Sequence, residues 1–160
     1  MPTSITATTD TTDRLAPVHH RIEVPLPPAQ AFELFTAGIA RWWPMVSHSC
    51  SAERDARVVF EPFVGGRVIE TASDGRQHTW GTLTAWQPPG HFAMTWHPGR
   101  PEAEATRLDV RFHAIDGGCA IELAHDGWSQ RGDGAEAREG YARGWPRVLA
   151  ELERIAKETA

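Results

Sequence analysis

The chain has 160 residues, of which 41% are hydrophobic and 23% charged, a composition that suits a globular domain and excludes a disordered or fibrous protein. No apolar run approaches the roughly 20 residues of a membrane-spanning helix, and the first fourteen residues lack the basic start and apolar stretch of a secretory signal. A net charge of -5 argues against a nucleic-acid partner, which usually requires a clustered basic face.

The cysteines and the tryptophans carry further information. Cys50 and Cys119 form no CxxC pair, so we expect reduced thiols in a cytoplasmic protein. Seven tryptophans imply a wide aromatic interior or a pocket. Residues 1–16 are rich in Thr, Ser and Asp and predict a disordered tail, whereas residues 17–160 show no linker and predict a single domain.

The first elements are a strand, a short helix and a helical turn. Val18–Leu26 alternates between apolar and polar residues, which predicts a strand. Residues 28–37 (PAQAFELFTA) predict an amphipathic helix that starts at proline and stops before Gly38. Residues 39–43 (IARWW) predict a helical turn that runs into Pro44.

From Arg57 onward the hydrophobic pattern changes to period two, which is typical of strands. Turn pairs such as Asp74-Gly75 separate the segments and favour antiparallel hairpins. The six predicted strands are Arg57–Pro62, Gly66–Ala72, Gln77–Gln87, His91–His97, Thr106–Ile115 and Cys119–His125.

The chain then predicts a long helix over Ala135–Glu158, with an apolar stripe at helical spacing and Asp133 as its N-cap. Pro146 removes one helical hydrogen bond, so we expect a kink or a restart at Gly144–Pro146. The predicted fold class is α+β, with a curved antiparallel sheet of about seven strands wrapped on this C-terminal helix. A gap between sheet and helix is the expected position of a ligand.

Five segments in this order resemble the START-like (SRPBCC) superfamily, whose fold is the helix-grip fold. They are RWWP at 41–44, PFVGGRVIE at 62–70, WGTLTAWQPPGHFAMTW at 80–96, IELAHDGW at 121–128 and GYARGWPRVLAEL at 140–152. Together they are similar to the branch related to the C-terminal domain of the activator of the heat-shock-protein-ninety ATPase. The resemblance spans about residues 18–158 and implies a domain of a superfamily that binds lipids, hormones and polyketides and includes cyclases and hydrolases.

Aromatic rows on the predicted strands supply most of the candidate binding residues. Strand 77–87 would place His78, Trp80, Thr82, Thr84 and Trp86 on one face, and strand 91–97 would place Phe92, Met94 and Trp96 on one face. Such rows either fill a core or line a pocket for an apolar or aromatic ligand. The full set of candidate ligand-binding residues is Trp42, Trp43, Phe60, Glu70, His78, Trp80, Met94, Trp96, Phe112, His125, Trp128, Tyr141 and Trp145.

Two polar residues of this set have alternative interpretations. His125 ends the last strand, where it would orient a ligand or donate a proton, or else bond to backbone or lie exposed. Glu70 is a buried acid or base if its strand face points inward, and a solvated carboxylate if that face points outward. The motifs of metalloproteases, serine hydrolases, P-loops and dinucleotide folds are absent. We therefore expect no metal and no cofactor, and assign no catalytic residue.

Three functions are compatible with the sequence. The leading hypothesis is binding of a small hydrophobic or aromatic molecule in a cavity between the sheet and the C-terminal helix. The second is an enzyme of cyclase, dehydratase or hydrolase type that uses the same cavity. The third is a chaperone-associated interaction module, and a homodimer is a further possible assembly.

Overall fold

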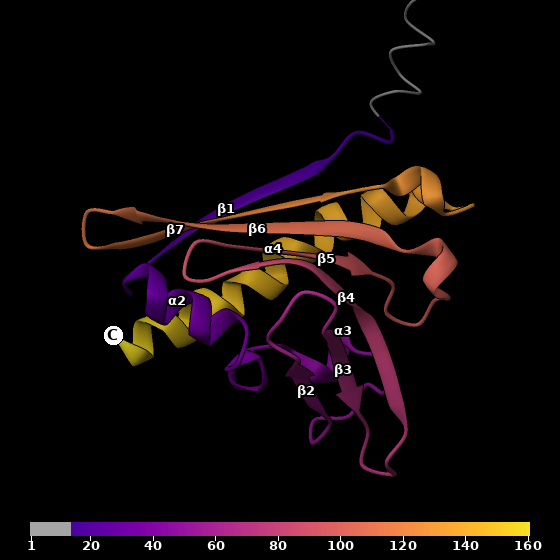
Figure 1. Ribbon diagram of the computed structural model, residues 1–160, viewed down its shortest axis with the longest axis horizontal. Helices are drawn as coiled ribbons and strands as arrows, with labels where there is room; N and C mark the ends of the chain where they lie inside the picture. Colours follow the sequence, from indigo (N-terminus) through magenta and orange to yellow (C-terminus); the bar gives the residue numbers. More distant parts are fainter. Residues whose placement is uncertain (1–13) are drawn as a thin grey trace, which may run out of the picture.

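Seven antiparallel strands form one sheet, in the order β1-β7-β6-β5-β4-β3-β2 (Figure 1). The computed structural model describes residues 14–160, so residues 1–13 of the predicted tail lie outside the described part. The strands are β1 (Val18–Val24), β2 (Arg57–Phe60), β3 (Arg67–Thr71), β4 (Gln77–Gln87), β5 (His91–Trp96), β6 (Thr106–Ile115) and β7 (Gly118–Asp126).

Helices lie on one side of this curved sheet. The long helix α4 (Gly134–Thr159) runs along it, and α2 (Pro28–Phe35) lies near the C-terminal end of α4 (Figure 1). The short α3 (Met45–His48) lies beside β3 and β4 in this view. Within residues 14–160, three 3-10 turns complete the list of elements: η1 (Ile39–Arg41), η2 (Glu102–Glu104) and η3 (Trp128–Gln130). The α+β helix-grip prediction is confirmed, and none of the helices in residues 14–160 is long and apolar enough to cross a membrane.

The predicted elements end within two residues of the observed ones. The first strand stops at Val24 instead of Leu26, because Pro25 has no N–H to offer the ladder. Helix α2 starts at Pro28 as predicted and buries Ala31, Phe32, Leu34 and Phe35.

Strand β4 changes its buried face in the middle, which the period-two pattern did not predict. Trp80, Gly81 and Leu83 are all buried while Thr84 is exposed, and the register with β3 shifts between Thr79 and Gly81, where Trp80 is the extra residue. The register with β5 shifts again between Leu83 and Ala85. The prediction that Thr82 and Thr84 share a face with Trp80 is therefore wrong. A β-bulge inserts one residue and reverses the alternation beyond it. Gly81 is required at this point, because a Cβ there would overlap the Thr95 carbonyl.

Helix α4 continues through Pro146 without a restart, so that part of the prediction is wrong. Pro146 itself is exposed, while Trp145, Val148 and Leu149 around it are buried. This continuous apolar stripe stabilises the helix across the missing hydrogen bond. Asp133 does precede the helix, but its carboxylate makes no capping bond.

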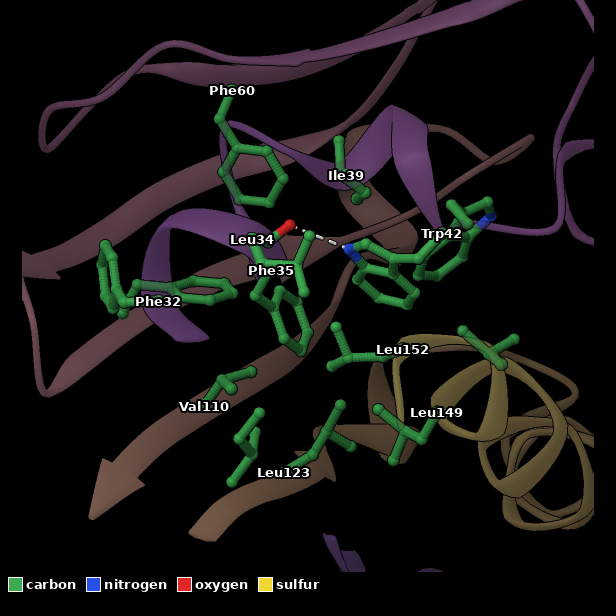
Figure 2. Close-up of a cluster of buried hydrophobic side chains, with 14 of the residues drawn as sticks. Phe32, Leu34, Phe35, Ile39, Trp42, Phe60, Val110, Leu123, Leu149 and Leu152 are labelled. Carbon is green, nitrogen blue, oxygen red and sulfur yellow. Dashed lines mark hydrogen bonds between the residues drawn. The ribbon is translucent and has the colours of Figure 1, made fainter. Parts of the chain in front are cut away.

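One end of the interior is a solid core. Figure 2 shows Phe32 and Phe35 of α2 in one cluster with Val110 of β6 and Leu152 of α4. The indole N–H of Trp42 is satisfied there, because it donates to the Leu34 carbonyl at 2.9 Å. The space between the sheet and the C-terminal half of α4 is thus filled by side chains.

Candidate ligand pocket

A pocket of about 530 Å³ lies beside the N-terminal half of α4, within the size range of about 300–1,000 Å³ typical of small-molecule sites. Its other walls are residues 48–50, which end α3, and residues 98–100, which follow β5. The lining residues are Trp43, His48, Ser49, Cys50, Trp96, Pro98, Gly99, Arg100, Arg131, Ala137, Gly140, Tyr141, Gly144, Trp145 and Val148.

Small residues on α4 create the space. Ala137, Gly140 and Gly144 are three and four residues apart, so they lie on one face of the helix. A Cβ atom added at Gly140 or Gly144 would meet nothing within 4 Å. Glycine in a helix interior is unfavourable by roughly 1 kcal/mol relative to alanine. These two glycines therefore leave open volume at some expense of helix stability.

Three indoles form the aromatic wall. The ring centroids of Trp43 and Trp96 are 6.0 Å apart, those of Trp43 and Trp145 are 5.9 Å apart, and those of Trp96 and Trp145 are 5.6 Å apart. Tyr141 extends this wall, and its hydroxyl accepts a hydrogen bond from Trp96 Nε1 at 3.2 Å. Rings held in this way present rigid apolar surface and π faces to a flat molecule.

A second layer of aromatic residues lies behind the wall. Trp80 is buried against Trp43 and Trp96, at centroid distances of 5.0 and 5.5 Å. Trp42 contacts Trp43 from the core side at 5.4 Å. Trp128 packs on Tyr141 at 5.7 Å. These second-layer residues do not line the pocket and instead fix the rings that do.

His125 belongs to this second layer and is fully buried. Trp145 Nε1 donates to His125 Nδ1 at 3.0 Å, so Nδ1 is an acceptor and the proton of the neutral ring resides on Nε2. That proton is donated to Thr106 Oγ1 at 2.7 Å, and Thr106 in turn donates to the Trp96 carbonyl.

Burial and the nearby Arg131 charge lower the pKa of His125 to about 3. His125 does not line the pocket, and both of its ring nitrogens are occupied. His125 therefore lies outside the pocket lining, and the alternatives of a backbone-bonded or exposed ring are wrong. A neutral, fully bonded imidazole orients Trp145.

Glu70 points inward and is buried, so the solvated alternative is wrong. Its carboxylate accepts hydrogen bonds from the N–H groups of Cys50 and Ser51, from the Ser51 hydroxyl and from Trp80 Nε1. Burial raises the pKa of Glu70, but these hydrogen bonds outweigh it and the net shift is downward. All four acceptor sites are used, so Glu70 anchors residues 50–51 to the sheet and does not line the pocket.

Cys50 lines the pocket and was not predicted from the sequence. Burial, followed by the adjacent Glu70 carboxylate, raises the pKa of its thiol to about 11. The thiol is therefore neutral at pH 7 and is a poor nucleophile.

Charged groups gather at the rim of the pocket. Arg131 binds the Asp133 carboxylate with two nitrogens, at 2.8 and 2.9 Å, and Arg100 binds both Asp133 and Glu104. The Arg131 hydrogen bond lowers the pKa of Asp133 to about 2. The two arginine cations are thus balanced by the carboxylates of Asp133 and Glu104, and the net formal charge of these four rim residues is zero.

The remaining predicted residues lie elsewhere. Phe60, Met94 and Phe112 are buried in the core, and the half-buried His78 pairs in register with Glu70 on β3. Of the thirteen predicted residues, the pocket is lined by Trp43, Trp96, Tyr141 and Trp145. The helical series Ala137, Gly140 and Gly144 was a usable sequence signal for the open side of α4. No comparable pattern in the sequence indicated that the loop residues 48–50 and 98–100 line the pocket.

A protein-family model described as "Activator of Hsp90 ATPase homolog 1-like protein" matches residues 25–157. The chain belongs to this family. In this Activator of Hsp90 ATPase homolog 1-like protein, the matched region begins before α2 and extends beyond Val148, the last residue of α4 that lines the pocket. Among curated proteins, comparison found no match.

Solved structures share the fold of this family member. One, described as an anthrahydroquino-Gama-pyrone synthase, Txn09, complexed with SUM, is 31% identical, with a TM-score of 0.62 and coverage of 87% of this chain and 96% of that chain. Protein MLL2253 from Mesorhizobium loti is 19% identical, with a TM-score of 0.68 and coverage of 91% and 99%. The Aha1 dimer from Colwellia psychrerythraea is 15% identical, with a TM-score of 0.65 and coverage of 89% and 96%.

Proposed function

We propose that the pocket binds a planar aromatic small molecule. The observation that carries this proposal is the wall of three indoles beside the small residues Ala137, Gly140 and Gly144 of α4. A flat ring system can lie against this rigid aromatic surface in the space that the small helix residues leave open. Its apolar surface would leave water on binding, which contributes about 25 cal/mol per Å² before the ordering costs.

The architecture behind the wall supports the same proposal. Trp145 and Trp96 are linked through His125 and Thr106 by a chain of hydrogen bonds, and residues 50–51 are held by Glu70. A site whose walls are fixed before binding loses less conformational freedom when the ligand arrives. The similarity to the synthase Txn09, which is described in complex with SUM, agrees with a role in binding small molecules.

Pocket-filling variants test the proposal. We expect 2-ethylnaphthalene to quench tryptophan fluorescence of the native chain and to raise its melting temperature. Gly140→Leu and Gly144→Leu place a side chain in open pocket space and should abolish both effects without unfolding the helix. Ala150→Leu puts the same residue on an exposed position of α4 that does not line the pocket, and should bind as the native chain does.

A second ligand tests the aromatic requirement. Decahydronaphthalene has a similar bicyclic skeleton without π electrons, and we expect it to bind more weakly than 2-ethylnaphthalene. If neither hydrocarbon binds the native chain, or if the leucine variants bind as well as Ala150→Leu, the proposed ligand site is wrong.

An enzyme of cyclase type in the same pocket is the alternative proposal, supported by the synthase description of the 31% identical structure. His125 and Glu70 offer no free proton-transfer group, which leaves His48, Cys50 and Tyr141 on the pocket wall. Cyclisation of a polyketide requires an enol or enolate, so the enzyme should accelerate exchange of the methyl protons of 2-acetonaphthone in deuterated water. An exchange rate equal to that of buffer alone would contradict this alternative.

The predicted chaperone partner, homodimer and cytoplasmic location stay predictions. The family description names an ATPase activator, and Phe63 and Val64 expose apolar side chains at the turn between β2 and β3. Co-purification with the heat-shock ATPase, a stimulated ATPase rate, and the molar mass from light scattering would test the two partner predictions. A monomer without effect on the ATPase would contradict both.

A further inference from the structure

We propose, building on the function proposed above, that the aromatic ligand carries a neutral carbonyl oxygen, which accepts a hydrogen bond from the Tyr141 hydroxyl. Tyr141 would then be a specificity-determining residue that selects aromatic ketones over aromatic hydrocarbons and over aromatic carboxylates. Three observations support this proposal: the hydrogen bonds around Tyr141, the charges at the rim and the charge behind Cys50.

The hydrogen bonds around Tyr141 leave its proton without an acceptor. Trp96 Nε1 can only donate, so the 3.2 Å bond between them makes the tyrosine oxygen the acceptor. Within residues 14–160 no hydrogen bond takes up the proton of this hydroxyl. The polar atoms of the neighbouring His125 ring are already used by Trp145 and Thr106.

The surroundings of Tyr141 also favour its protonated form. The His125 ring lies 4.7 Å from the tyrosine ring and Trp128 lies 5.7 Å away, so the side chain is enclosed by aromatic surface on the sheet side. Burial raises the pKa of Tyr141, and the Trp96 N–H and the Arg131 guanidinium beside the hydroxyl reduce this rise without reversing it. A protonated phenol on the pocket wall is a hydrogen-bond donor, and its natural ligand is an oxygen acceptor.

The charges determine which kind of oxygen is preferred. The Nε and Nη2 atoms of Arg131 are engaged by Asp133, and Arg100 is shared between Asp133 and Glu104. Elsewhere in the lining, the Glu70 carboxylate lies behind Cys50, whose backbone N–H binds it. A ligand carboxylate would find no uncompensated cation and would meet this negative charge. A neutral carbonyl avoids both penalties.

Three naphthalenes that share one ring system test the proposal: 2-acetonaphthone, 2-ethylnaphthalene and 2-naphthoate. We expect Tyr141→Phe to weaken 2-acetonaphthone roughly 3- to 10-fold, the effect of one hydrogen bond, and to leave 2-ethylnaphthalene within about twofold. The native chain should bind 2-naphthoate more weakly than 2-acetonaphthone. An equal loss for ketone and hydrocarbon, no loss for the ketone, or preferred binding of 2-naphthoate would overturn the proposal.

A spectroscopic measurement on the native chain avoids dependence on the folding of the variant, in which Trp96 loses its acceptor. The carbonyl stretch of ¹³C-labelled 2-acetonaphthone should move to lower frequency in the native pocket than in hexane. If the Tyr141 proton has another acceptor, the frequency of the carbonyl stretch should be the same in the pocket as in hexane. That result would overturn the proposal. Binding of 2-ethylnaphthalene without a ketone preference overturns this inference alone, whereas failure of both ligands to bind overturns the proposed function as well.

Discussion

Trp145 donates its indole N–H to His125 Nδ1 across 3.0 Å, and both side chains are buried. One of the two belongs to the pocket wall and the other does not. The bond therefore connects the last strand of the sheet to the helix face that contains the pocket. It fixes the orientation of the Trp145 ring and, through the acceptor role of Nδ1, the tautomer of His125.

The first prediction compares two tryptophans in this region. Trp145→Phe leaves His125 Nδ1 buried without a donor, so we expect a loss of about 1–3 kcal/mol in the free energy of unfolding. Trp128 Nε1 is buried with no partner among the described residues. Trp128→Phe should therefore cost less than Trp145→Phe, since it removes an unsatisfied donor along with part of the ring. Urea unfolding measures both, and a larger loss for Trp128→Phe would contradict this account.

The second prediction concerns acid. His125 has a pKa of about 3 in the folded chain against an ordinary value of 6.5, so the unfolded chain binds more protons between these values. Stability is then fully present above pH 6.5 and declines as the pH falls towards 3, at up to about 1.4 kcal/mol per pH unit. The non-titrating variant His125→Gln should show a flatter profile between pH 6.5 and 5. An unchanged slope in urea unfolding would show that another group is responsible.

The third prediction concerns the carboxylate that anchors the loop at the pocket. Glu70→Gln replaces one acceptor oxygen by an NH₂ donor, which faces the donors of Cys50, Ser51 or Trp80. We expect a loss of about 2–3 kcal/mol in stability and weaker binding of 2-ethylnaphthalene, because Cys50 lines the pocket. Glu23→Gln changes an exposed carboxylate and should stay within about 0.5 kcal/mol. Equal effects of the two variants would refute the anchoring role.

The fourth prediction concerns the charge at the rim. Asp133→Asn removes the carboxylate shared by Arg131 and Arg100, leaving a net positive rim. Binding of 2-naphthoate, measured by tryptophan quenching, should strengthen several-fold while 2-ethylnaphthalene is unaffected. Asp126→Asn, which alters an ion pair with Arg107 on the sheet and away from the pocket lining, is the matched control. The interpretation fails if both variants change 2-naphthoate binding equally.

The aromatic rows illustrate how far the sequence could predict the site. Period-two spacing indicated that Trp80, Met94 and Trp96 point inward, and all three are buried. Whether an inward ring reaches the pocket depends on how deep its strand lies beneath α4. The spacing of apolar residues along one strand carries no information on this depth. Trp80 therefore lies behind the wall while Trp96 is part of it. The bulge at Trp80 was missed because it depends on the pairing of two strands.

The sequence by itself determined the order and approximate bounds of the elements, because hydrophobic periodicity and turn residues act over short distances. Its resemblance to the START-like superfamily indicated the helix-grip fold. Only the tertiary structure decided that His125 supports a tryptophan, that Glu70 anchors a loop, and that loops 48–50 and 98–100 complete the pocket. These assignments depend on which polar atoms from distant segments meet, and on how much of the space beneath the sheet the aromatic side chains of α2 and the adjoining turn already fill.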